Sequence, residues 1–296
     1  MTFGTRDSFE YLECGNCGCV QLLEIPRDMA KYYPSGYYSL APHGPFKRFL
    51  RRCWSANAYG RFNPVGRLFA EVFFDHRSML AIRRLNPSKE TRVLDVGCGR
   101  GNLLNDLAWL GFKNLTGVDP YLDSDIQGPN GVNILKRDVT EIQGMFDLIM
   151  LNHSFEHVPN PLSVMQAVSD HLAPDGTAIV GIPVASSFAY KQFGTNWCNF
   201  DAPRHFFLHT EKSIGILASK AGLRMVEIIH EGNDEQFWLS EQYSRNVAGV
   251  ENGSLSSSVL KRLASWPRLR RDRIKARQLN EKREGDLVCF LLKRLA

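Results

Sequence analysis

One stretch, VLDVGCGRGN at residues 93–102, constrains the fold of this 296-residue chain more than any other. A short apolar run passes directly into a turn that contains Gly97, Gly99 and Gly101, and a helical pattern begins at Asn102. Glycine allows left-handed backbone conformations and lets the backbone approach a ligand without interference from a Cβ atom. A buried strand that leads through such a turn into a helix predicts a cofactor-binding loop in an α/β fold.

The same alternation of short apolar runs and helical patterns continues along the chain. The expected strands are Arg92–Val96, Leu115–Val118, Val132–Leu135, Phe146–Leu151, Thr177–Ile182, Leu223–His230 and Leu287–Leu292. The expected helices are Asn102–Leu110, Pro161–Leu172 (ended by a turn at 173–176) and a segment capped by Thr210. Alternating strands and helices predict a parallel sheet that is covered on both faces. Ligands of such sheets bind beyond the carboxyl ends of the strands.

Composition narrows the class of protein further. An apolar fraction of 44% and a charged fraction of 23% are ordinary for a globular domain. We find no apolar run near the roughly 18 residues that a membrane span requires, and no signal-peptide pattern at the N-terminus. Seven scattered cysteines argue against a disulfide framework. We therefore expect a cytoplasmic protein.

The pattern divides the chain into three parts. Residues 1–45 are rich in Tyr, Pro, Gly and Cys, and residues 46–90 form a helical lead-in. The expected main domain is 91–296, with a helical insertion at 231–285 before the last strand.

That insertion carries the basicity of the protein. Residues 261–284 contain ten Lys or Arg and three acids, so the positive charge belongs to one segment. Two interpretations stay open for residues 255–284. In the first, they form two solvent-exposed helices that cover the edge of the hydrophobic core. In the second, they form a surface that binds anionic lipid at the membrane periphery. No specific nucleic-acid partner is expected.

Acidic residues at successive strand ends indicate which cofactor the glycine turn holds. A dinucleotide fingerprint needs its third glycine at position 102, which is Asn102 here. Asp95 lies two residues before the first glycine, where it repels a pyrophosphate and suits a cation. Asp119 is placed to accept hydrogen bonds from ribose hydroxyls, and Asp138 from an exocyclic amine. These residues predict a phosphate-free adenosine that carries a positive charge, and they disfavour a nicotinamide dinucleotide.

Five motifs in order resemble those of the class I S-adenosylmethionine-dependent methyltransferases. They are VLDVGCGRG, GVDP, KRDVTE, FDLIMLNHSFEHVPNP and LAPDGTAIVGIP. The resemblance covers about residues 88–230 and the final strand, roughly half of the chain. It implies a Rossmann-like seven-stranded sheet, mostly parallel with an antiparallel last strand, and S-adenosyl-L-methionine as the cofactor. The implied cofactor-binding residues are Asp95, Gly97, Cys98, Gly99, Gly101, Asp119, Pro120, Asp138, Val139 and Asn152.

Two histidine-containing segments are candidates for the chemistry, because an oxygen nucleophile needs a base. The segment DAPRHFFLHT resembles a stretch in methyltransferases of polysaccharide and nucleotide-sugar metabolism, and His205 matches a histidine that acts in proton transfer. Arg204 replaces an acidic neighbour of that histidine. It binds an anionic group of the acceptor, or it pairs with Asp201 and fixes the loop. His157 is the second candidate base, or it orients a loop.

The N-terminal cysteines resemble a degenerate zinc knuckle. Cys14, Cys17 and Cys19 include the C-x₂-C spacing, but the next cysteine is Cys53, and His43 would have to supply a fourth ligand. We expect a metal-free remnant of the N-terminal modules of sugar methyltransferases.

The predicted function is S-adenosylmethionine-dependent O-methylation of a glycan-related or other small-molecule acceptor. A quinone- or phenol-type O-methyltransferase is the nearest alternative. A non-catalytic partner protein that retains only the methyltransferase fold is another.

Overall fold

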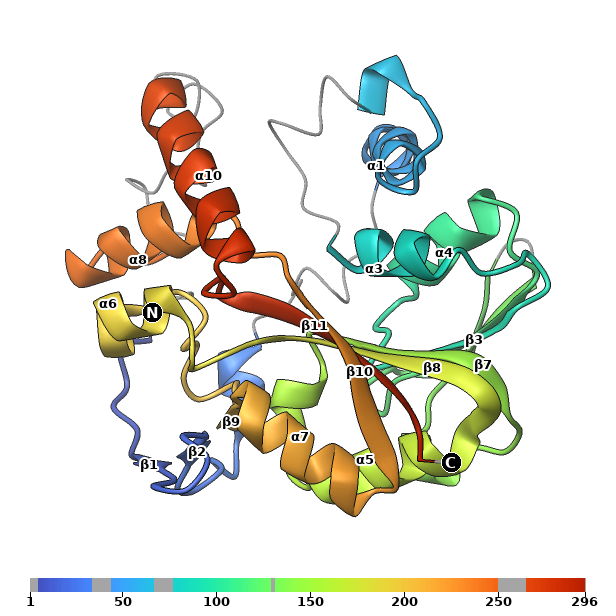
Figure 1. Cartoon of the computed structure of the whole chain (residues 1–296), viewed down its shortest axis with the longest axis horizontal. Coiled ribbons are helices and arrows are strands. Elements are labelled where there is room, and N and C mark those ends of the chain that lie inside the picture. Colours follow the sequence, from blue (N-terminus) through green and yellow to red (C-terminus); the bar gives the residue numbers. More distant parts are fainter. Residues whose placement is uncertain (1–4, 34–43, 67–76, 129–130, 250–264, 296) are drawn as a thin grey trace.

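The computed structural model describes residues 5–33, 44–66, 77–128, 131–249 and 265–295. Its centre is a sheet of eight strands in the order β10-β11-β8-β7-β3-β4-β6-β5 (Figure 1). The strands are β3 (Arg92–Val96), β4 (Asn114–Val118), β5 (Ile126–Gln127), β6 (Val132–Leu135), β7 (Phe146–Asn152), β8 (Leu172–Pro183), β10 (Leu223–His230) and β11 (Leu287–Arg294).

The directions of the strands confirm the predicted sheet. Strands β6, β4, β3, β7 and β8 are parallel. Strand β11 runs antiparallel to both β8 and β10, so β10 and β11 form the expected closing hairpin. The short strand β5, which pairs antiparallel with β6, is an eighth strand that the sequence pattern did not predict.

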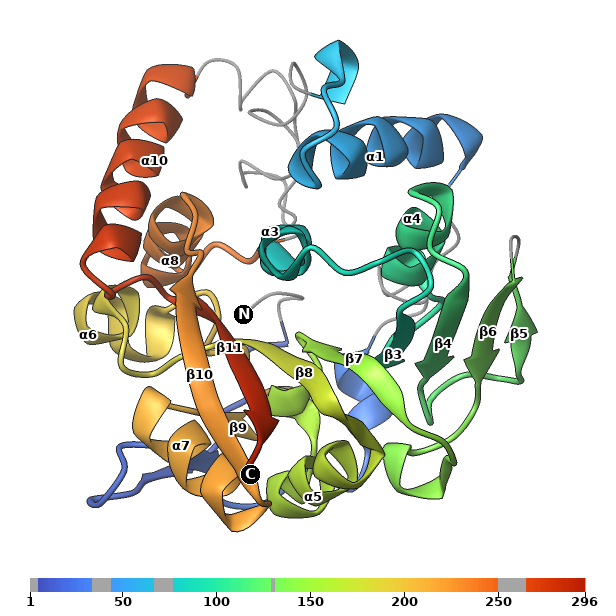
Figure 2. The same cartoon turned by 45° about the vertical axis from the view of Figure 1, so that its right-hand side comes forward.

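Helices cover both faces of this sheet (Figure 2). One face packs against α1 (Pro45–Ala58), α3 (Arg77–Leu85) and α4 (Asn102–Trp109), and the other against α5 (Pro161–His171) and α7 (Glu211–Lys220). Successive side chains of a strand point to opposite faces. In β3, Val93 accordingly joins the core beneath α3 and α4, and Leu94 joins the core beneath α5 and α7. Thr210 caps α7, as predicted.

One predicted boundary is wrong. A turn at 173–176 was expected to separate the helix from its strand, but β8 already begins at Leu172. Leu172 pairs with Phe146 and Thr177 with Leu148, so the pairing register shifts across this turn. The proline and glycine of this segment therefore form an irregularity inside the strand, and the preceding helix ends at His171.

Several predicted helical positions lie outside the described residues. They are residues 67–76 of the helical lead-in and residues 250–264 of the insertion. The described insertion contains α8 (Glu235–Ser244) and the basic helix α10 (Trp266–Glu281), which packs with α8 and α6 (Phe188–Phe193) at one end of the sheet (Figure 1). Among the described helices, none combines the length and the apolar character that a bilayer crossing requires.

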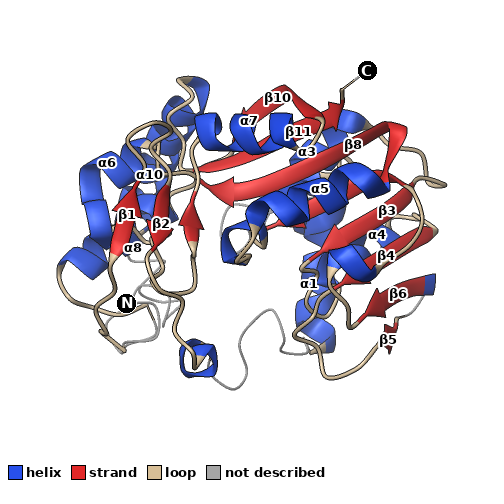
Figure 3. Cartoon of the chain, turned by 90° about the horizontal axis from the view of Figure 1, so that it is seen from below, coloured by secondary structure: helices blue, strands red, loops and turns tan. Residues whose placement is uncertain are grey.

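A second, three-stranded sheet connects the N-terminal segment to the main domain. Strands β1 (Tyr11–Glu13) and β2 (Val20–Leu22) form a hairpin, and β2 pairs with β9 (Phe207–Leu208), as Figure 3 shows from below. A short helix, η1 (Met29–Tyr32), follows β2. Since β9 directly follows the segment with His205, the N-terminal hairpin supports the segment in which we predicted the base.

Candidate active site

The glycine turn connects β3 to α4 and leaves little room for other residues. Gly97 has φ +74°, and a Cβ there would lie 2.4 Å from Cβ of Ser154. Gly101 has φ +71° and precedes the first residue of α4. The Ser154 hydroxyl donates a hydrogen bond of 2.7 Å to the Val96 carbonyl. The turn is therefore packed directly against the segment that follows β7.

Two buried carboxylates stand beside this turn. Burial and, to a smaller extent, the charge of Asp119 together raise the pKa of Asp95 to about 7, although a hydrogen bond from Asn152 opposes the rise. No ion pair from a described residue reaches either carboxylate. A buried carboxylate is stabilised by an opposite charge nearby. This pair therefore fits a ligand that brings its own positive charge.

The acids are fixed by backbone donors. Asp119 accepts hydrogen bonds from the N–H of Gly99 at 2.8 Å and of Tyr121 at 2.9 Å, one on each oxygen. Asp138 caps the turn after β6, where its Oδ1 accepts from the N–H and hydroxyl of Thr140. The remaining lone pairs of both carboxylates fit hydroxyl or amine donors of a nucleoside.

The structure brings the predicted cofactor residues to one edge. Asp95, Asp119, Asp138 and Asn152 lie at or just beyond the carboxyl ends of β3, β4, β6 and β7. The other members follow these strand ends within the turns, namely Gly97, Cys98, Gly99, Gly101, Pro120 and Val139. Burial raises the pKa of the Cys98 thiol, so this side chain is a neutral wall of the site. Their roles in binding remain predictions.

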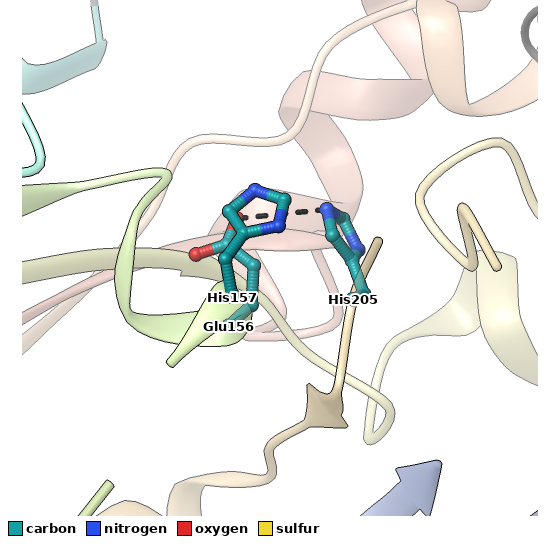
Figure 4. Close-up of side chains that lie close together, drawn as sticks. All are labelled: Glu156, His157 and His205. Carbon is teal, nitrogen blue, oxygen red and sulfur yellow. Dashed lines mark ion pairs between the residues drawn. The ribbon is translucent and has the colours of Figure 1, made fainter. Parts of the chain in front are cut away.

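A second group lies at the same sheet edge and consists of Glu156, His157 and His205 (Figure 4). Glu156 and His157 belong to the short helix η4 (Phe155–His157) after β7. The Phe206 N–H donates to the Glu156 carbonyl at 2.9 Å, and Nδ1 of His157 donates to the Arg204 carbonyl at 2.7 Å. These bonds join both predicted histidine segments.

His205 is held as a neutral imidazole. Its Nδ1 donates to the Asn199 carbonyl at 2.8 Å, which leaves the lone pair on Nε2. Burial and the neighbouring His157 lower the pKa of His205 to about 4, although the negative charges of Asp201 and Glu156 oppose the shift. The Nε2 atom lies 3.8 Å from carboxylate oxygens of both Glu156 and Asp201.

Glu156 carries the negative charge of this group. Burial raises its pKa, but the neighbouring imidazoles of His153, His157 and His205 outweigh burial and bring the pKa to about 2. Glu156 is therefore ionised at neutral pH, whereas His205 is not.

Arg204 forms an ion pair with Asp201. Its guanidinium also lies over the ring of Tyr33, with 5.8 Å from Cζ to the ring centroid. The side chain is buried. This geometry corresponds to the interpretation in which Arg204 fixes the loop, and its contact with an acceptor remains a prediction.

Tyr33 is a site residue that sequence reasoning missed. Burial raises its pKa, and its electrostatic neighbours are Arg204, Asp201, Tyr121 and Glu156. It therefore lies near Arg204 and Glu156 and near Tyr121, which follows Asp119 in the sequence by two positions. The tyrosines at positions 32 and 33 were the available signal, but nothing in their spacing indicated contact with residues about 170 positions away. The importance of Glu156 was likewise underestimated.

The N-terminal cysteines surround the turn between β1 and β2. Cys14 is exposed, Cys17 is half-buried, and Cys19 is buried with its Sγ 3.8 Å from Nδ1 of His209. In the described part of the chain, the three side chains arranged closely enough to hold a metal are those of Glu156, His157 and His205. His43 lies outside that part, so the metal-free remnant stays a prediction.

Comparisons with known proteins agree with the predicted family. Ubiquinone biosynthesis O-methyltransferase of Shewanella pealeana is 34% identical over 96 residues, which are 29% of this chain and 40% of that relative. The enzyme of the same name from Pseudomonas aeruginosa is 31% identical over 157 residues, 47% of this chain and 66% of the relative. This chain therefore spans about two fifths of the length of the first of these relatives.

Solved structures with a similar arrangement are more distant. The 1,6-didemethyltoxoflavin-N1-methyltransferase of Burkholderia thailandensis is 15% identical, covering 86% of this chain and 93% of that chain, with a TM-score of 0.45. An O-methyltransferase from a trans-AT PKS multienzyme of Brevibacillus brevis is 16% identical, covering 69% and 67%, with a TM-score of 0.41.

A family model described as a methyltransferase domain matches residues 66–228, more than half of the chain. This range contains the glycine turn, the strand-end acids and both histidine segments. The match confirms the resemblance that the five sequence motifs indicated. The chain belongs to the methyltransferase domain family.

Proposed function

We propose that this protein transfers a methyl group from S-adenosyl-L-methionine to a hydroxyl oxygen of a small-molecule acceptor. When bound, this cofactor supplies an electrophilic methyl group on a cationic sulfur. The observation that carries the proposal is the pair of buried carboxylates, Asp95 and Asp119, which lack a described cationic partner beside the glycine turn. A ligand with an ammonium and a ribose, and without phosphate, is complementary to these groups.

The residues expected to bind it divide by chemistry. Asp95 faces the cationic end, Asp119 accepts from the ribose hydroxyls, and Asp138 accepts from the adenine amine. The backbone of the glycine turn approaches the ligand closely because it carries no Cβ atoms. The Ser154–Val96 hydrogen bond links this turn to η4, which supports a methyl acceptor beside the histidine group.

His205 is the base in this proposal. A neutral imidazole with its lone pair on Nε2 accepts a proton, and the Nδ1 bond to the Asn199 carbonyl holds that tautomer. Glu156, 3.8 Å from Nε2, stabilises the imidazolium that forms. His157 is held against the Arg204 carbonyl and orients the loop.

Two acceptor classes are candidates. The segment DAPRHFFLHT resembles methyltransferases of glycan and nucleotide-sugar metabolism, which favours a sugar hydroxyl. The curated relatives carry the name of ubiquinone biosynthesis enzymes, which favours a phenol. Cytoplasmic location and lipid contact through residues 255–284 remain predictions.

Calorimetry with S-adenosylmethionine, S-adenosylhomocysteine and a nicotinamide dinucleotide tests the cofactor. Binding of the first two and not the third is expected, and the reverse would refute the proposal. Transfer of a labelled methyl group to nucleotide sugars, glycans and phenols then identifies the acceptor. His205→Ala, measured on protein from which metal ions have been removed, should lower kcat by about 10²–10⁴-fold. Its affinity for S-adenosylhomocysteine should stay unchanged. His171→Ala, at the last residue of α5, is the control.

A further inference from the structure

The carboxylate of Glu156 has a feature that proton transfer leaves unexplained. It is fully buried, and neither oxygen has a hydrogen-bond partner among the described residues. The nearest imidazole nitrogens, on His153 and His205, lie 3.5 and 3.8 Å from Oε1. An ionised carboxylate is costly to bury unless hydrogen bonds or an opposite charge compensate it.

The two neighbouring histidines present the nitrogen atoms that a metal ion requires. Nδ1 of His157 donates to the Arg204 carbonyl at 2.7 Å, and Nδ1 of His205 donates to the Asn199 carbonyl at 2.8 Å. Both Nε2 lone pairs are thereby left available. Metal-binding histidines usually donate their other N–H to a carbonyl or carboxylate in this way. The rings lie at 67° with centroids 4.8 Å apart.

These three side chains lie close together. One ligand atom from each of Glu156, His157 and His205 lies within 4.8 Å of the others, and Figure 4 shows the two rings beside the carboxylate. Ligands at roughly 2.0–2.2 Å from a common ion are about 3–3.5 Å apart, so the side chains need to close only slightly. We propose that Glu156, His157 and His205 bind a divalent transition-metal cation.

The donor set indicates which cations fit. Two imidazoles and one carboxylate suit Mn²⁺, Fe²⁺, Co²⁺ or Zn²⁺, whereas Mg²⁺ and Ca²⁺ prefer sets of oxygen atoms. Arg204, the nearby cation, is engaged by Asp201. Three protein ligands leave coordination positions open for other groups.

The consequence for catalysis rests on the proposed function. A hydroxyl oxygen that binds at an open position loses its proton to solvent more readily. The Nε2 atom of His205 is then a ligand, so its role as base applies to the metal-free protein. Chelation should accordingly lower turnover if the cation activates the acceptor, and leave turnover unchanged if His205 acts alone.

Metal binding itself is tested on the full-length protein after removal of metals. Titration with Mn²⁺, followed by loss of the free-ion electron paramagnetic resonance signal, should give one bound ion per chain. Mn²⁺ is chosen because Cys14, Cys17 and Cys19 favour softer ions. Glu156→Gln and His205→Asn should each weaken binding by at least about tenfold.

His171→Gln is the matched control. The Nδ1 of His171 also contacts a backbone carbonyl, that of Gly144 at 2.9 Å, but His171 is not part of the group that could hold a metal. Its substitution should leave Mn²⁺ affinity unchanged. Absence of binding at millimolar Mn²⁺, or binding that Glu156→Gln and His205→Asn leave intact, would overturn the cation site.

Calorimetry with S-adenosylhomocysteine on the same samples separates this inference from the proposed function. Retained binding in Glu156→Gln shows that the variant is folded, so its loss of Mn²⁺ supports the site. If Glu156→Gln is unfolded, His157→Asn with Co²⁺ absorption spectroscopy replaces it. Mn²⁺ binding by wild-type protein that ignores S-adenosylhomocysteine would refute the cofactor proposal and leave the cation site standing.

Discussion

The hydroxyl of Tyr11 donates a hydrogen bond of 2.9 Å to the backbone carbonyl of His205, across 194 positions of sequence. The Tyr11 ring also packs edge-on against Phe200 with centroids 4.8 Å apart. Immediately after His205, the Leu22 N–H donates to the Phe206 carbonyl. The N-terminal hairpin therefore fixes the carbonyl groups of the predicted base and of the residue that follows it.

Tyr11→Phe should loosen this loop without disturbing the cofactor site. Loss of one hydrogen bond to a partly buried carbonyl costs about 1 kcal/mol, and turnover should fall a few-fold because His205 is held less rigidly. S-adenosylhomocysteine affinity should stay constant by calorimetry. Tyr190→Phe is the control, because no hydrogen bond from its hydroxyl to a described residue is found. Equal turnover in the two variants would contradict the supporting role.

The cofactor edge could be predicted from the sequence because its signals are local. A carboxylate at a strand end and glycines in the following turn are defined within a few residues, as with Asp95 and Gly97. The alternating pattern then places every strand end at one edge. The acids lie at that edge as expected, and Asp95 and Asp119 are near enough that the charge of Asp119 raises the pKa of Asp95.

The histidine group depended on contacts between distant segments, which no local period encodes. Tyr33 reaches the ring face of Arg204 from the N-terminal segment, and the buried carboxylate of Glu156 has meaning only once His205 lies beside it. The prediction that a turn at 173–176 separates the helix from its strand failed for a similar reason. Leu172 and Thr177 on either side of these residues both pair with β7, so β8 continues across them despite their proline and glycine.

Gly97→Ala should destabilise the protein. A Cβ there would lie 2.4 Å from Cβ of Ser154, and φ is +74°, so overpacking and backbone strain combine to cost about 2–4 kcal/mol. Thermal unfolding should shift downward by roughly 5–10 °C. Gly215→Ala is the control, because it lies inside α7 with no atom within 4 Å of an added Cβ. That variant should be neutral or more stable, and an equal loss in both would refute the packing argument.

Asp119→Asn should weaken cofactor binding more than it weakens the fold. The amide can accept from Gly99 or Tyr121 through one oxygen only, and the negative charge is lost. Hydrogen bonds to charged groups contribute about 1.5–3 kcal/mol, so Kd for S-adenosylhomocysteine should rise roughly 10–100-fold by calorimetry. Asp147→Asn tests a carboxylate at the opposite end of β7, where it pairs with Arg92. An unchanged Kd is expected there.

Cofactor affinity should increase with pH through the titration of Asp95. The pKa of this carboxyl is raised from 3.8 to about 7, so between these values the folded state keeps a proton that the unfolded state loses. Stability without ligand therefore falls as pH rises through this window and levels off above pH 7. A cationic ligand needs the ionised form, so affinity should fall up to about tenfold per pH unit below 7 and be constant above it. Calorimetry with S-adenosylhomocysteine at pH 6, 7 and 8 measures this slope, and Asp95→Asn should abolish it. Equal wild-type affinity at pH 6 and pH 8 would mean that the ligand does not contact the Asp95 carboxylate.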